Sequence, residues 1–142
     1  MKNIDSIVQH IKTKYQFSSM EDLCHMLGIN LKIVPPDRYI LFDGYGCLVK
    51  SDNGKKHILL SNTCPEDLQA FVAAHEIGHA LLHDVELVHF GLHKNESRIE
   101  EEANNFAIKL LGIKAERIEG YTEEDYSKLL GIPKEAVKYI FE

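Results

Sequence analysis

The sequence is poor in cysteine and has no long apolar run, and each absence narrows the class of protein. The three cysteines, Cys24, Cys47 and Cys64, are odd in number, widely spaced and form no Cys-x-x-Cys pair. They are therefore expected to be reduced thiols that fill the core. No apolar stretch approaches the roughly 18 residues needed to cross a bilayer, and the N-terminus lacks the apolar core of a secretory signal. We therefore expect no membrane partner and a cytoplasmic location.

The composition is that of an ordinary globular domain with an uneven charge distribution. The chain has 142 residues, of which 44% are hydrophobic and 27% are charged, enough for one domain with a real core. Residues 1–60 carry 8 basic and 6 acidic side chains, whereas residues 61–142 carry 8 and 16, for a net charge of −6. The acidic second half argues against direct nucleic-acid binding.

Hydrophobic periodicity and turn residues predict an α+β fold in a single domain. Helical spacing dominates both ends of the chain, whereas the central part has the pattern of strands. The Asp52-Asn53-Gly54 turn predicts a hairpin between residues 46–50 and 56–60, because Asn-Gly tolerates positive φ. The expected parts are N-terminal helices in 1–30, a small antiparallel sheet in 31–62, two core helices in 65–112 and a C-terminal helical hairpin in 122–142.

The chemistry is expected at His75-Glu76-Ile77-Gly78-His79, which has the form His-Glu-x-x-His. Residues four apart on an α-helix lie about 40° apart around the axis and about 6 Å along it, so both imidazoles can reach one ion. Neutral imidazole suits Zn²⁺, and Glu76 can reach a zinc-bound water without taking a coordination position. The motif therefore predicts one zinc ion held by His75 and His79, with Glu76 as the general base.

The surroundings of the motif favour a metal site over two ordinary core or surface histidines. Pro65 and the acidic pair that follows it are typical of a helix start, and the predicted helix runs from about 65 to 83. Apolar residues recur along this helix at helical spacing. Imidazole and carboxylate groups within such a stripe would be costly to bury without a partner.

A catalytic zinc site needs a third protein ligand, because three ligands and one water complete its coordination. The position six residues after His79, where a metzincin has a further histidine, is Val85, which excludes that class. The next predicted helix offers carboxylates instead. Glu100 shares a face with small and polar residues and is favoured, with Glu102 as the alternative. Asn104, one turn after Glu100, is placed to orient a ligating imidazole.

Three further histidines follow the motif. His83 continues the row of the two ligands, but the row has by then drifted about 80° around the helix, so a place behind the ligands or at the helix end is favoured. His89 and His93 fall in a predicted loop over 84–96, from which either could stabilise a developing oxyanion. The helix after this loop is expected to start at a Ser97 cap.

Two stretches of this region carry a family resemblance when they are taken together. They are His75-Glu76-Ile77-Gly78-His79-Ala80-Leu81-Leu82-His83 and Glu100-x-Glu102-Ala103-Asn104-x-Phe106-Ala107-x-x-Leu110-Leu111. In this order and at this separation they resemble the ImmA/IrrE family of metallopeptidases, and the resemblance covers mainly residues 65–112. One departure is the end of the second stretch, where Gly112-Ile113 replaces the x-Pro of many family members.

The resemblance implies a small zincin-like domain with the activity of a zinc-dependent endopeptidase of the gluzincin type. Such proteins occur in bacteria, phages and mobile elements, and they typically cleave a helix-turn-helix transcriptional repressor in response to stress or DNA damage. Carried over to this chain, the resemblance makes His75 and His79 ligands, Glu76 the general base and Glu100 the third ligand. The partner that it implies is a protein substrate, such as a transcriptional repressor.

Two other classes of function stay open from the sequence. A non-catalytic module would use zinc as a structural or regulatory element and would hold a repressor or a toxin-like partner. A closed four-ligand site, with His83 or His93 in the fourth position, would favour that module, whereas the intact Glu76 favours the enzyme. A DNA-binding regulator would use the C-terminal helices, but three consecutive acidic residues from Glu123 weaken that interpretation.

Overall fold

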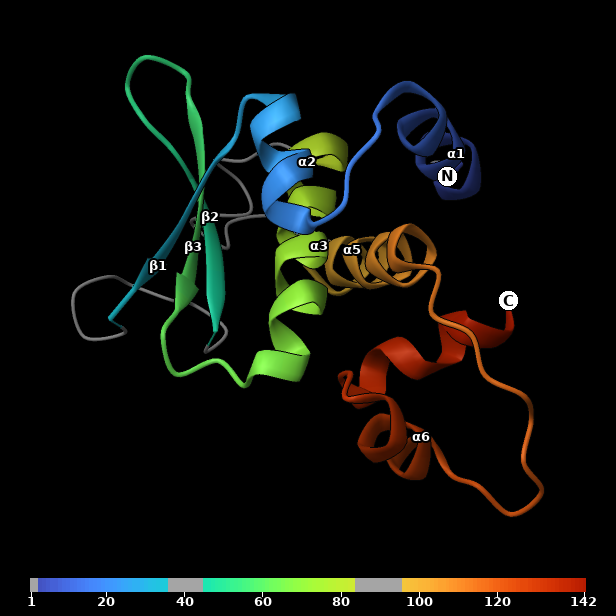
Figure 1. Cartoon of the computed structure of the whole chain (residues 1–142). Coiled ribbons are helices and arrows are strands. Elements are labelled where there is room, and N and C mark those ends of the chain that lie inside the picture. The colour runs from blue at the N-terminus through green and yellow to red at the C-terminus, as the bar shows by residue number, and fades with distance from the viewer. Residues whose placement is uncertain (1–2, 36–44, 84–95) are drawn as a thin grey trace.

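A computed structural model describes residues 3–35, 45–83 and 96–142 of the chain. It confirms the expected α+β class, because a three-stranded sheet lies beside a group of helices (Figure 1). In chain order the elements are α1 (Ile4–Lys14), α2 (Met20–Leu27), β1 (Asn30–Val34), β2 (Gly46–Lys50), β3 (Lys56–Ser61), α3 (Glu66–Leu82), α5 (Glu96–Leu111), α6 (Glu123–Leu130) and the 3-10 helix η1 (Lys134–Phe141).

Capping residues set several helix ends where the sequence places them. At the start of α2, the Ser19 hydroxyl accepts a hydrogen bond from the backbone N–H of Asp22. At the start of α6, Thr122 and Asp125 form a capping box. Gly28 ends α2 with a φ of 74°, a left-handed conformation that glycine adopts at little cost. These local signals fix the ends of the shorter helices.

One helix prediction is wrong in detail, and the type of another helix was not predicted. Helix α5 begins at Glu96 rather than after a Ser97 cap, so Ser97 lies within its first turn. The last helix, η1, is a 3-10 helix that follows directly after Pro133. Both helix types place apolar residues three to four positions apart, so periodicity alone does not separate them in a short segment.

The sheet is mixed, which corrects the antiparallel sheet expected from the hairpin. Strands β2 and β3 pair antiparallel on either side of the predicted turn, with Cys47 opposite Leu59. Strand β1 pairs in parallel with the other side of β3, with Leu31 opposite Ile58, so the strand order is β1-β3-β2. Strand β3 therefore lies between β1 and β2, which run in opposite directions. A hairpin turn predicts the pairing of its own two strands and says nothing about a third.

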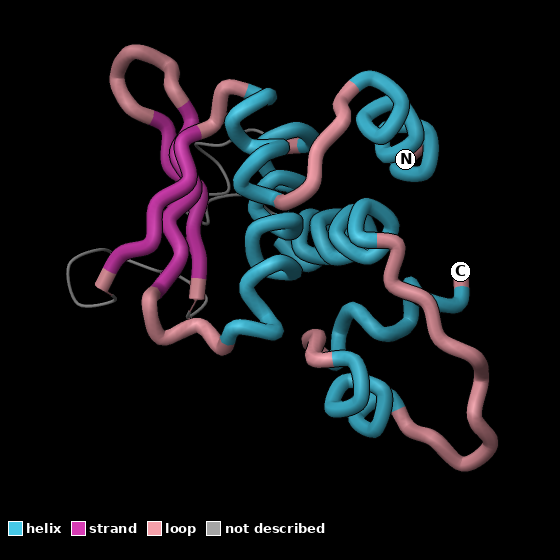
Figure 2. The backbone as a smooth tube through the Cα atoms, in the orientation of Figure 1, coloured by secondary structure: helices cyan, strands magenta, loops and turns pink. Residues whose placement is uncertain are grey.

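Helix α3 lies between the sheet and helix α5 (Figure 1 and Figure 2). It packs against β2 and β3 on one side and against α5 on the other, while η1 packs on both α5 and α6. From Phe71 to its end α3 is mostly buried, and the buried residues include Ile77 and several alanines. A helix enclosed in this way is apolar on most of its surface, and a polar group on it needs a partner.

Two glycines let α3 and its neighbours approach closely. A Cβ atom on Gly78 would lie 3.0 Å from Cδ1 of Phe106 on α5, and one on Gly46 would lie 2.7 Å from Cγ1 of Val72. Phe106 is completely buried, so its ring has little room to move away. Glycine at position 78 therefore sets the distance between α3 and α5.

Gly78→Val is expected to lower the free energy of unfolding by about 1–3 kcal/mol, because the added side chain overpacks against Phe106. Urea-induced unfolding followed by circular dichroism measures the change. The matched control is Ala70→Val on an exposed position of the same helix. It introduces the same β-branched residue without the packing conflict. Equal losses of stability in the two variants would contradict the close packing.

The three cysteines have the state that the sequence predicts. Cys24, Cys47 and Cys64 are buried free thiols, as predicted. Burial, together with a nearby carboxylate, raises the pKa of Cys24 and of Cys47 to about 11, so neither is a thiolate at neutral pH.

Within the three described ranges of the chain, no helix is both long and apolar enough to cross a lipid bilayer.

Candidate metal centre

Three side chains from two helices converge where α3 faces α5. His75 and His79 lie one turn apart on α3, and Glu100 reaches them from α5. Glu100 Oε2 lies 2.9 Å from His75 Nε2, and Glu100 Oε1 lies 3.0 Å from His79 Nε2. The two Nε2 atoms are 3.2 Å apart. Among the residues that the structure describes, this is the group of His, Cys, Asp and Glu side chains whose ligand atoms are close enough to hold one metal ion.

The donor set of this group fits a zinc ion. Ligand atoms about 2.0–2.1 Å from a tetrahedral zinc lie about 3.3 Å from one another. The separations of 2.9–3.2 Å in the group are close to that value. Two imidazoles and one carboxylate also form a known type of catalytic zinc site, which keeps one position for water or substrate. The arrangement can therefore hold a metal, while ligation by these three residues stays a prediction.

The electrostatics of the group favour the carboxylate form of Glu100. Burial alone would raise the pKa of Glu100, but hydrogen bonds from His75 and His79 and their positive charge hold it well below its usual range. Burial alone would likewise lower the pKa of His75, but the hydrogen bond to Glu100 and the negative charges of Glu76 and Glu100 raise it. A metal ion bound by these atoms would displace the proton that they share.

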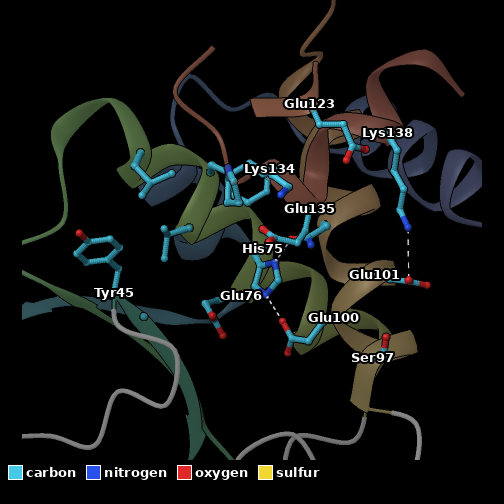
Figure 3. Close-up of a pocket in the computed structure, with 16 residues that line it drawn as sticks. Tyr45, His75, Glu76, Ser97, Glu100, Glu101, Glu123, Lys134, Glu135 and Lys138 are labelled. Atoms are coloured by element: carbon cyan, nitrogen blue, oxygen red, sulfur yellow. Dashed lines mark hydrogen bonds and ion pairs between the residues drawn. The ribbon is translucent and has the colours of Figure 1, made fainter. Parts of the chain in front are cut away.

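The metal group is buried on one side and open on the other. The His79 side chain is 2% exposed and that of His75 14%, whereas Glu100 is 36% exposed. The open side faces a cleft of about 660 Å³, whose lining includes His75, Glu76 and Glu100 (Figure 3). Glu76 itself is buried, so the expected general base and the metal group share one cleft.

The cleft has an apolar wall and a charged wall. The apolar wall comes from α3, from the first residue of β2 and from the residue before it, and consists of Leu68, Phe71, Val72, Gly46 and Tyr45. The charged wall comes from α5, α6 and η1, and consists of Glu101, Glu123, Lys134, Glu135 and Lys138, with the uncharged Ser97 beside them. Figure 3 shows Tyr45 across the cleft from Glu101 and Lys138, which form an ion pair of 3.4 Å.

The part played by the C-terminal elements was not predicted from the sequence. Residues 122–142 are expected only to form a helical hairpin, and no motif in them indicates that Lys134 and Glu135 line the cleft. The packing of η1 on α5 brings them there. The two histidines considered as oxyanion stabilisers, His89 and His93, lie outside the described residues.

Asn104 contacts the far side of the His75 ring. Its Oδ1 lies 2.8 Å from His75 Nδ1. An amide oxygen only accepts, so the ring donates from Nδ1. Without metal, His75 Nε2 donates to Glu100, but a neutral ring that donates from Nδ1 keeps the lone pair of Nε2 for a metal ion. Asn104 therefore has the position expected of a residue that orients a ligating imidazole.

Glu102, the alternative third ligand, contacts His83 and not the metal group. Glu102 Oε1 lies 2.9 Å from His83 Nε2, and His83 Nδ1 lies 2.9 Å from His79 Nδ1. Neither Glu102 nor His83 offers an atom to the group formed by His75, His79 and Glu100. The structure thus brings Glu100 to the two imidazoles, and His83 does not close the site as a fourth ligand.

Comparisons with known proteins agree with this geometry. The family model described as the IrrE N-terminal-like domain, a peptidase family, matches residues 38–141. The chain is 27% identical over 139 residues to the "Uncharacterized immunity region protein 2" of Bacillus phage phi105, and the alignment covers 93% of this chain and 85% of the phage protein. No solved structure gives a significant match. Because the family match spans most of the chain and includes the whole metal group, the chain belongs to the ImmA/IrrE family of metallopeptidases.

Proposed function

We propose that the protein is a zinc-dependent endopeptidase in which His75, His79 and Glu100 hold the ion and Glu76 is the general base. The observation that carries this proposal is the convergence of three ligand-type side chains beside a buried carboxylate in one cleft. Membership of the family supports a metallopeptidase in general. A structural zinc site has no need of Glu76, so its place in the cleft favours an enzyme over a non-catalytic binding module.

The proposed reaction is hydrolysis of a peptide bond. When bound, zinc supplies a Lewis acid that polarises the scissile carbonyl and lowers the pKa of water to about 7. Glu76 accepts a proton from the attacking water while the water oxygen bonds to the carbonyl carbon. As the C–N bond breaks, Glu76 delivers that proton to the leaving amine nitrogen. The carboxylate is thereby regenerated for the next cycle.

The shape of the cleft suits an extended peptide. Among the described strands, β2 lies at an edge of the sheet, and its first residue, Gly46, and the preceding Tyr45 line the cleft. An extended segment can add to a strand edge through backbone hydrogen bonds, with alternate side chains entering pockets. In this arrangement the apolar wall of α3 takes an apolar side chain of the substrate, and the charged wall faces the opposite side of the peptide.

The proposed substrate is a specific protein, such as a helix-turn-helix transcriptional repressor. The name of the phage phi105 relative places that protein in an immunity region, which supports a role connected with repression. The second half of the chain carries 16 acidic and 8 basic residues, which favours a protein partner over a nucleic acid.

The proposal is tested by incubating the zinc-loaded protein with peptides prepared from a bacterial proteome and identifying new termini by mass spectrometry. We expect new termini in the presence of zinc and none after a chelator has removed the metal. A panel of purified helix-turn-helix repressors from phages then tests the substrate, with cleavage of one repressor at one site as the expected result. No new terminus from peptides or repressors, with zinc bound, would contradict the endopeptidase.

A further inference from the structure

A second line of contacts leads from the metal group into the protein. His79 turns its Nε2 toward Glu100 and its Nδ1 toward His83, whose Nδ1 lies 2.9 Å away. His83 Nε2 in turn lies 2.9 Å from Glu102 Oε1. The side chains of His83 and Glu102 are 2% and 10% exposed, so water competes little for these contacts. The line therefore joins a buried ring of the metal group to a buried carboxylate on α5.

Donor and acceptor chemistry assigns the hydrogens along this line. A carboxylate only accepts, so His83 donates its Nε2–H to Glu102. A neutral imidazole has one N–H, so His83 Nδ1 is then an acceptor and takes the Nδ1–H of His79. Without metal, His79 Nε2 donates to Glu100. In the neutral ring that binds a metal, the Nδ1–H is held by His83, so the lone pair of Nε2 is left for the ion.

We propose that His83 and Glu102 are positioning residues that fix the tautomer and the ring orientation of His79 for metal binding. They act through His79, since neither belongs to the group of ligand atoms formed by His75, His79 and Glu100 or to the lining of the cleft. The inference rests on the proposed zinc site and extends it to two side chains that are not ligands. Partners of this kind are usual behind metal-binding histidines, where they hold the ring and raise its basicity.

Helix α5 would thus position both imidazoles. It holds His75 directly through Asn104, and it holds His79 through the ring of His83. Asn104 accepts from His75 Nδ1 at 2.8 Å. Glu102 lies two residues after Glu100, about 200° around the helix, so it cannot share the face that meets the metal group. The His83 ring spans the gap between Glu102 and His79 with two contacts of 2.9 Å.

The competing explanation is a buried pair that serves only the stability of the fold. In that case, truncation of Glu102 lowers the stability of the metal-free protein but leaves the zinc affinity of the folded protein unchanged. The relay, meaning the line of hydrogen bonds from His79 through His83 to Glu102, predicts instead that truncation of Glu102 weakens zinc binding by the folded protein. The thermal stability of the metal-free protein and its zinc affinity are therefore measured separately for every variant.

The test is zinc affinity, measured by competition with a fluorescent chelator. Glu102→Ala is expected to weaken zinc binding by about 10–100-fold. Glu102→Gln is expected to keep most of the affinity, because its amide oxygen still accepts from His83 Nε2. The control is Glu124→Ala, which removes an exposed carboxylate on α6 and should leave zinc affinity unchanged. Equal weakening by Glu102→Ala and Glu102→Gln would overturn the hydrogen-bond relay.

A double-mutant cycle adds a readout that a purely structural role would not move. His83→Ala is expected to weaken zinc binding about as much as Glu102→Ala, and the double variant no further, because either change breaks the same line. His83→Ala also supplies the test if Glu102→Ala does not fold. Wild-type zinc affinity in the folded single variants, or losses that add in the double variant, would overturn the relay. A wild-type protein that binds no zinc would overturn the metal centre itself together with the relay.

Discussion

Glu76→Gln is expected to abolish peptide cleavage while the protein keeps its zinc. The amide has nearly the volume of the carboxylate, so the neighbouring metal group is undisturbed, but it cannot take the proton of the attacking water. General acid–base catalysis contributes about 10²–10⁴-fold, so kcat should fall by at least about 10²-fold. The measurement compares the rate at which new peptide termini form with the zinc content of the same preparation.

The matched control for this variant is Glu66→Gln, which changes an exposed residue in the first turn of the same helix. It should retain both zinc and cleavage. Cleavage at the wild-type rate by zinc-loaded Glu76→Gln would remove Glu76 from the mechanism. Loss of zinc from Glu76→Gln would instead place Glu76 among the ligands.

His79→Ala is expected to remove the zinc altogether. The His79 Nε2 atom lies 3.0 Å from Glu100 Oε1 and 3.2 Å from His75 Nε2, so it is central to the donor group. Its loss leaves two protein ligands where a catalytic zinc site uses three. Metal content after dialysis measures the effect, with His10→Ala on the exposed face of α1 as the control. Stoichiometric zinc in His79→Ala would show that this ring is not a ligand.

Local signals were sufficient to predict the elements that carry the site. Helix α3 spans Glu66–Leu82, close to the predicted 65–83, because Pro65 suits a helix start and the helical spacing of apolar residues continues to its end. The strands Gly46–Lys50 and Lys56–Ser61 likewise lie on either side of the turn that the sequence predicts. In both cases the determinants lie within a few residues of the element that they specify.

The arrangement of these elements depends on contacts between distant segments, and the sequence predicted it less well. The parallel pairing of β1 with β3 places one strand between two others, which a hairpin motif does not specify. Helical spacing favoured Glu100 over Glu102 but left both open, and the crossing of α3 and α5 brings Glu100 to the imidazoles. The line from His79 through His83 to Glu102 depends on the same crossing, whose distance Gly78 sets.

The most direct test of the central claim, a single zinc held by His75, His79 and Glu100, is native mass spectrometry of the dialysed wild-type and Glu100→Ala proteins. We predict one zinc per chain in the wild type and its loss or sharp weakening in Glu100→Ala, with both proteins folded. A wild-type protein without zinc, or a Glu100→Ala protein that holds zinc as tightly as the wild type, would contradict the claim.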